Sequence, residues 1–199
     1  MMCLRLLALA ALMSLAAGCL AHREPRHIYS LEGAVDEATQ VGAGAERPVM
    51  RLQRVLIPDY LDTADILSRE GTHEVHESST GRFAERLSVG ITHALRSDLA
   101  SRLPQYAIAL TQPAGAATRQ ILVTVDQLDI QPNGRCLLVA DWTLVGADRK
   151  TLLSADRGIF SAAATAVSPR DAAIVTAIAD VVQQLADRIA VSAESSGGP

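Results

Sequence analysis

The sequence has little of what is typical of disulfide-bonded proteins, nucleic-acid-binding proteins or enzymes. Three cysteines in 199 residues cannot supply a disulfide framework. With 18 basic and 22 acidic residues the formal net charge is −4, which argues against a nucleic-acid partner because phosphate contacts need a basic surface. No Gly-x-Ser-x-Gly elbow occurs, and the segment 42–45 lacks the lysine of a phosphate-binding loop. We therefore predict a protein that is not an enzyme and binds no cofactor.

Long apolar runs are also scarce, and the clearest one lies at the N-terminus. It extends from Leu4 to Ala17 with Arg5 near its start, and is shorter than the roughly 20 residues that a membrane-spanning helix needs. The small residues that end the run directly precede Cys19. A basic start, a short apolar core and small residues before a cleavage point are typical of a secretory signal peptide. We predict that residues 1–18 are a signal peptide.

Cys19 directly follows the predicted cleavage point. The segment Leu15-Ala16-Ala17-Gly18-Cys19 resembles the lipobox of bacterial lipoproteins, which implies cleavage before Cys19 and acylation of its thiol and new amino group. The alternative is an ordinary secreted protein with an unmodified cysteine. If Cys19 carries lipid, residues 19–25 form a polar tether. Cys136 then has no partner and is expected to be a small buried hydrophobic residue.

Residues 26–191 are predicted to form a single α+β domain, and residues 192–199, rich in Ser and Gly, a disordered tail. Apolar patterns predict strands at 26–31, 50–57, 106–110, 120–130, 136–145 and 151–162. The segment 73–79 is polar and is either an edge strand or a loop. Pro132-Asn133-Gly134 predicts a hairpin turn, because Asn and Gly tolerate positive φ. A change of parity near Gln127 predicts a β-bulge.

Two segments have the period of an amphipathic helix. Between residues 81 and 103 an apolar residue recurs every four positions, and Pro104 ends the pattern. The second apolar stripe covers residues 174–189. Ser168 is its expected N-cap, and Asp171 is expected to favour the N-terminal end of the helix dipole.

These elements predict an α+β fold with a largely antiparallel sheet of about five strands and two long helices packed on one face. One face of the strand at 136–145 is expected in the core, with Trp142 as a packing residue. The opposite face would carry Leu137, Val139, Asp141, Thr143 and Val145. A face that is partly apolar either is exposed to water or meets another protein, and we favour self-association or a partner contact.

Two further groups of residues are candidates for a chemical site. His73 and His76 are three residues apart, whereas the zincin pattern places two histidines four apart on a helix, so we predict a polar loop and no metal. Asp59 and Asp62 follow Pro58 in a predicted turn, where Asp is common because it hydrogen-bonds locally. No catalytic residues are predicted.

The stretch from Arg54 to Asp62 carries a family resemblance. Its sequence is Arg54-Val55-Leu56-Ile57-Pro58-Asp59-Tyr60-Leu61-Asp62. A strand that ends in Pro and continues as Asp-Tyr-Leu-Asp resembles the signature of the PqiC-type lipoproteins, the ABC-type transport auxiliary lipoprotein family. Tyr29 in the first strand and the long C-terminal helix agree with it, whereas Phe83 stands where the family often has Trp. Pro58, Asp59, Tyr60 and Leu61 are expected to shape a partner contact or a tight turn.

The resemblance implies a lipoprotein on the periplasmic face of the outer membrane. It would be a non-enzymatic auxiliary subunit of an intermembrane lipid transport system and dock the transport tube at the outer membrane. The implied partners are an MCE-domain (PqiB-like) protein and ABC or PqiA-like membrane components. Leu20, rather than Asp, after Cys19 favours outer-membrane sorting.

A homo-oligomeric ring is expected, because the end of a tube is rotationally symmetric. The alternatives are a stand-alone lipid carrier, which needs an apolar cavity, and a regulator of envelope enzymes.

Overall fold

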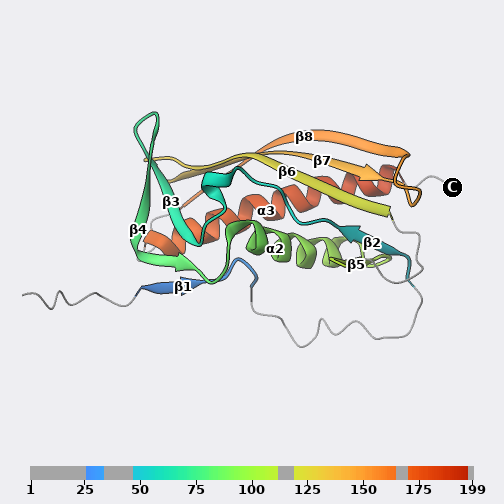
Figure 1. Ribbon diagram of the computed structural model, residues 1–199, viewed down its shortest axis with the longest axis horizontal. Helices are drawn as coiled ribbons and strands as arrows, with labels where there is room; N and C mark the ends of the chain where they lie inside the picture. The colour runs from blue at the N-terminus through green and yellow to red at the C-terminus, as the bar shows by residue number, and fades with distance from the viewer. Residues whose placement is uncertain (1–25, 34–46, 112–118, 165–169, 197–199) are drawn as a thin grey trace, which may run out of the picture.

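A five-stranded sheet and two long helices form the two main layers of the fold, with both helices along one face of the sheet (Figure 1). The computed structural model describes residues 26–33, 47–111, 119–164 and 170–196. The strands are β1 (His27–Tyr29), β2 (Val49–Leu52), β3 (Asp65–Glu70), β4 (Glu74–Phe83), β5 (Ala107–Ala109), β6 (Arg119–Ile130), β7 (Arg135–Val145) and β8 (Leu152–Ala163). The helices are the short 3-10 helix η3 (Asp59–Leu61), α2 (Leu87–Arg102) and α3 (Arg170–Ser195).

The larger sheet has the strand order β5-β2-β6-β7-β8. β2 lies parallel to both β5 and β6, whereas β6, β7 and β8 pair antiparallel. A smaller sheet has the order β1-β4-β3, and its hairpin of β3 and β4 projects from one end of the molecule (Figure 1). The α+β prediction is confirmed, with five strands in the main sheet, but this sheet is mixed because β2 pairs parallel with both of its neighbours. The long connection from β2 to β5, which includes α2, allows parallel pairing that a hairpin cannot give.

The central hairpin of β6 and β7 forms as its local sequence predicts. The register shifts between Val125 and Gln127, so the predicted bulge is present. Gly134 has a φ of 80° and its N–H donates to the carbonyl of Gln131 at 2.9 Å. Positive φ at this turn costs glycine little because it has no Cβ.

The start of the first long helix and the end of the last helix differ from the prediction. The first helix begins at Leu87, because residues 81–83 end β4 and pair with β1. Phe83 lies in β4 and its side chain is buried, so it extends the four-residue apolar spacing of the helix without belonging to the helix. The last helix continues through Ser195, so the disordered tail predicted from residue 192 was wrong at its start. Ser192 is buried there and its hydroxyl accepts a hydrogen bond from the indole N–H of Trp142 at 3.2 Å. Ser168 lies outside the described residues.

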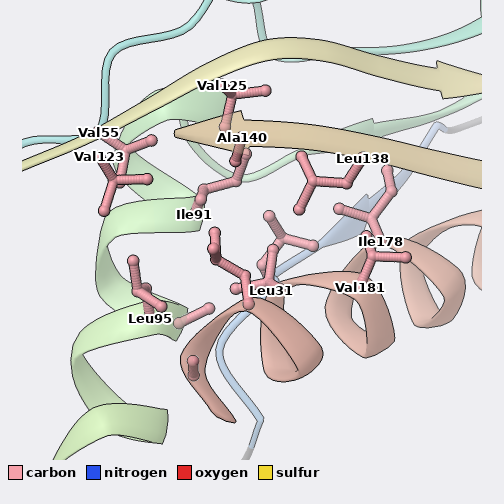
Figure 2. Packing of buried hydrophobic residues seen from close by; sticks show 14 of the residues in the cluster. Leu31, Val55, Ile91, Leu95, Val123, Val125, Leu138, Ala140, Ile178 and Val181 are labelled. Atoms are coloured by element: carbon pink, nitrogen blue, oxygen red, sulfur yellow. The ribbon is translucent and has the colours of Figure 1, made fainter. Parts of the chain in front are cut away.

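The core lies between the helices and the inner face of the sheet (Figure 2). Its side chains include Ile91, Leu95, Val123, Val125, Leu138, Ala140, Ile178 and Val181. Burying a large aliphatic side chain contributes about 1.5–3 kcal/mol, so this layer fixes the helices on one face, as predicted. The face of the sheet opposite α2 and α3 is called the outer face below.

No helix within the described residues has the length and apolarity that crossing a membrane requires.

Candidate partner-binding surface

The segment between β2 and β3 runs beside β6 and then turns sharply. Leu56 forms an isolated parallel bridge with Thr124 of β6. The N–H of Leu56 donates to the carbonyl of Val123 at 3.0 Å, and its own carbonyl accepts from Val125 at 2.8 Å. Pro58 then precedes η3, in which the N–H of Leu61 donates to the carbonyl of Pro58 at 2.9 Å. The tight turn therefore begins at a residue whose ring already restricts φ.

Some side chains of this segment point into the core and others into solvent. Val55 and Leu61 are 1% and 4% exposed, and the N–H of Val55 donates to the hydroxyl of Thr92 in α2 at 3.0 Å. Leu56 and Tyr60 are 64% and 51% exposed. Two apolar side chains are thus held at the surface by a backbone that is anchored on both sides. We call Leu56 and Tyr60 the exposed pair.

A polar cluster around Asp62 fixes the turn to the start of α2. Its carboxylate lies 3.2 Å from Arg86 and 3.6 Å from Arg54, and it accepts a hydrogen bond from the backbone N–H of Ser88 at 3.3 Å. Burial by itself would raise the pKa of Asp62, but hydrogen bonds from Ser88 and Arg86 outweigh it and lower the pKa. The charge also favours the N-terminal end of the helix dipole.

The structure separates the four residues that the sequence singles out. Leu61 is buried and holds the turn, whereas Tyr60 is exposed and available for contact. Asp59 opens η3 after Pro58. The sequence analysis did not single out Leu56 as a surface residue. Its only signal was its position in a strand between two apolar neighbours, because successive side chains of a strand point to opposite faces. Cys19 lies outside the described residues.

The outer face of the sheet is partly apolar, as expected. Residues Leu138, Ala140, Trp142 and Leu144 of β7 are buried on the inner face, and the alternate residues of β7 face outward. Val139 is 9% exposed beside Ile159 of β8, which is 70% exposed. Arg157 lies 2.6 Å from both Asp126 and Asp141. This ion-paired group divides the apolar residues of the face.

A polar cleft of about 480 Å³ lies between the β3–β4 hairpin and the start of α3. Asp171 is buried at its base and accepts hydrogen bonds from the hydroxyls of Ser78 at 2.9 Å and Thr80 at 2.6 Å. Arg69 on another wall lies 2.6 Å from the buried Asp129. Asp171 therefore fixes β4 to α3, a role that its position near the helix start did not indicate.

The remaining candidates have structural roles. His76 lies in β4 with its Nε2 3.0 Å from Glu70 and 3.1 Å from Glu74, and the described residues contain no group of side chains that could hold a metal ion. Burial, with a smaller effect of Asp129, raises the pKa of Cys136 to about 12. A thiol that stays protonated is a poor nucleophile.

These features define a small α+β domain whose candidate site is an exposed surface. Residues 29–190 match the model of the family described as ABC-type transport auxiliary lipoprotein component. The chain belongs to this family, as the stretch from Arg54 to Asp62 implied. It is therefore an auxiliary lipoprotein component of a transport system.

Individual relatives agree with the family. The chain is 25% identical over 128 residues to the intermembrane transport lipoprotein PqiC of Escherichia coli (strain K12), which covers 64% of this chain and 67% of that protein. PqiC of Shigella flexneri matches equally.

Two crystal structures share the fold. One, of an uncharacterized protein, has a TM-score of 0.68 at 18% identity and covers 84% of this chain and 97% of its own. The other, protein XCC0632 from Xanthomonas campestris, has a TM-score of 0.61 at 9% identity and covers 76% and 91%. At these identities the likeness concerns the fold alone.

Proposed function

We propose that this protein is an outer-membrane lipoprotein that faces the periplasm and docks the tube of an MCE-type lipid transport system. It acts by binding and not by catalysis. Its partners are an MCE-domain protein of the PqiB type and ABC or PqiA-like membrane components. The family places the chain among transport auxiliaries, and the name of its Escherichia coli relative refers to intermembrane transport.

The observation that supports docking is the exposed pair. Leu56 and Tyr60 belong to the stretch that carries the family resemblance, yet neither contributes its side chain to the core. The turn beneath them is fixed by Val55, Leu61 and Asp62. Side chains on a rigid base lose little conformational entropy when they bind, and tyrosine is among the residues that most often dominate the binding energy of an interface.

The proposed anchor sets how far the domain can move from the membrane. An extended chain spans at most about 3.6 Å per residue, so the residues between Cys19 and Arg26 reach about 25 Å. Three acyl chains bind durably, because each buried methylene contributes about 0.8 kcal/mol. The lipid would supply location, and the folded domain would supply the contact.

A ring of identical copies remains part of the proposal, because a closed ring repeats one interface and matches the symmetry of a tube end. The carrier alternative gains no support from the cleft beside α3. That cleft is lined by hydroxyl and charged side chains such as Ser78, Arg69 and Asp171, whereas acyl chains require apolar walls. The regulator alternative differs in its partner, which would be an envelope enzyme.

The test is co-purification of the full lipidated protein with the MCE-domain protein of the same cells. The double variant Leu56→Ser/Tyr60→Ser is expected to reduce recovery of that partner about tenfold or more, as for loss of two interface anchors. Val191→Ser, at a position of α3 that is 59% exposed, is the matched control and is expected to bind normally. Undiminished recovery with the double variant would reject the exposed pair as the contact. Recovery of a cell-wall enzyme in place of transport subunits would favour the regulator.

Cys19→Ser tests the anchor separately. The variant is expected to leave the membrane fraction and to lose acyl labelling. Membrane retention equal to that of the wild type would contradict lipidation at this residue.

A further inference from the structure

Strand β8 forms one edge of the five-stranded sheet, and its pairing shows which of its backbone groups face outward. The N–H of Ala164 donates to the carbonyl of Gly134 in the hairpin partner at 2.7 Å. Since orientation alternates along a strand, even-numbered residues of β8 bond to β7 and odd-numbered residues direct N–H and C=O away from the sheet. The carbonyl of Ser161 agrees, because it accepts a hydrogen bond from the side chain of Gln184 in α3 at 3.2 Å.

The middle of this edge is open. Helix α3 caps the outward carbonyl of Ser161, but among the described residues nothing bonds the outward backbone groups of Ala155, Arg157 and Ile159. These three residues therefore present three donors and three acceptors in the spacing of an unpaired strand. We call residues 155–159 the open edge.

The usual protections of an edge strand are weak here. The open edge contains neither proline nor lysine. Arg157 is drawn back over the outer face by its ion pairs with Asp126 and Asp141, so its side chain does not cover the edge. Asp156, a charge on the inner side, is held by hydrogen bonds from Ser154 at 2.8 Å and Ser192 at 3.0 Å.

We propose that the open edge binds an extended segment of a partner protein, which adds a sixth strand to the sheet. The segment carries an apolar side chain beside Ile159, which is 70% exposed. It is neutral or basic, because two carboxylates, of Asp126 and Asp141, flank the single positive charge of Arg157 on the outer face. Main-chain hydrogen bonds supply affinity in strand addition, and side chains at alternate positions supply selectivity.

The identity of the partner rests on the proposed function, which makes it a subunit of the transport system. The experiment places a photo-crosslinking amino acid at Ala155 in the full lipidated protein, in its native envelope. The same amino acid at Val191 of α3 is the control, since that residue is also exposed. Mass spectrometry identifies the partner peptide.

Two substitutions then separate backbone from side chain. Ile159→Pro removes an outward N–H that bonds nothing in the fold, whereas Ile159→Val keeps it. The proline variant is expected to reduce the crosslink about tenfold and the valine variant less than about twofold. Hydrogen exchange on the wild-type chain gives a second readout that needs no variant to fold: the amides of Ala155, Arg157 and Ile159 become protected only when the partner is bound.

Each outcome decides the matter. A proline-sensitive crosslink to an extended segment of a transport subunit, with protected amides, supports the proposal. The same result with a protein from another system supports the edge and rejects the proposed function. A crosslink to a second copy of this chain rejects the proposed occupant. Transport subunits that co-purify without a crosslink at Ala155 and without amide protection reject the edge and leave the proposed function standing.

Discussion

Replacing Gly81 by alanine tests how the β3–β4 hairpin is fixed to α3. A Cβ atom on residue 81 would lie 2.6 Å from Oδ2 of Asp171 and 2.9 Å from Cε2 of Tyr29. Both separations are below van der Waals contact, so a neighbour must move. Asp171 cannot move freely, because its carboxylate is buried and accepts hydrogen bonds from Ser78 and Thr80.

The expected cost follows from these contacts. Adding one methyl group to a close-packed site costs about 1–3 kcal/mol. Displacing Asp171 also weakens hydrogen bonds to a charged group, each of which contributes about 1.5–3 kcal/mol. We therefore expect Gly81→Ala to lower the free energy of unfolding by about 2–4 kcal/mol, a large share of the roughly 5–15 kcal/mol that a domain has. Gly33→Ala, whose Cβ would meet nothing within 4 Å, is the control and is expected to change it by less than about 0.5 kcal/mol.

A double-mutant cycle identifies the cause. In an Asp171→Ala background the close contact of the methyl group with the carboxylate is gone and the one with Tyr29 stays, so the cost of Gly81→Ala is expected to fall by at least about 1 kcal/mol. Urea denaturation followed by far-UV circular dichroism measures all four chains. Equal costs in the two backgrounds would refute the contact with Asp171 as the reason, and no cost at all would show that the hairpin adjusts freely.

Three further outcomes are expected. Trp142→Phe removes the hydrogen bond to Ser192 and should lower the free energy of unfolding by about 1–2 kcal/mol in thermal denaturation; additivity with Ser192→Ala would contradict the pairing. Burial raises the pKa of Cys136 to about 12, so a thiol reagent at neutral pH should modify it only in denaturant, and rapid labelling of the native chain would oppose this. Burial by itself would raise the pKa of Asp62, but its hydrogen bonds outweigh burial and lower the pKa. The ionised carboxylate therefore contributes stability that is complete above the pKa of the unfolded chain and is lost as the pH falls through the pKa of the folded protein. Asp62→Asn should therefore lower the free energy of unfolding at neutral pH and lower it much less near pH 3. An equal loss at both pH values would argue against a stabilising role of the ionised carboxylate.

Local elements were predictable because neighbouring residues determine them. The turn at Pro132-Asn133-Gly134 and the alternation of β7 each use information within about a dozen residues, and both are confirmed. The stripe of α3 was equally clear, since apolar residues recur on one side of it over many turns. The packing of the helices on the sheet follows from these patterns, because the apolar face of each helix and of the sheet must be buried against another apolar face.

Boundaries and pairing were less predictable. Phe83 fits the apolar period of α2 although it belongs to β4, because a buried side chain looks the same in either element. The parallel place of β2 between β5 and β6 depends on residues far apart in the sequence. Ser192 reads as part of a polar tail until its partner Trp142 is known.

The sequence by itself determined the composition of the core, the central hairpin, the two amphipathic helices and the family to which the chain belongs. Periodicity and turn chemistry are local, so they can be read without a structure. Only the tertiary structure decided that Leu56 and Tyr60 face solvent while Leu61 is buried, and that Asp171 joins a hairpin to a helix. It also decided that β8 is an edge. Strand order and register arise from contacts between distant residues, and exposure depends on all of them together.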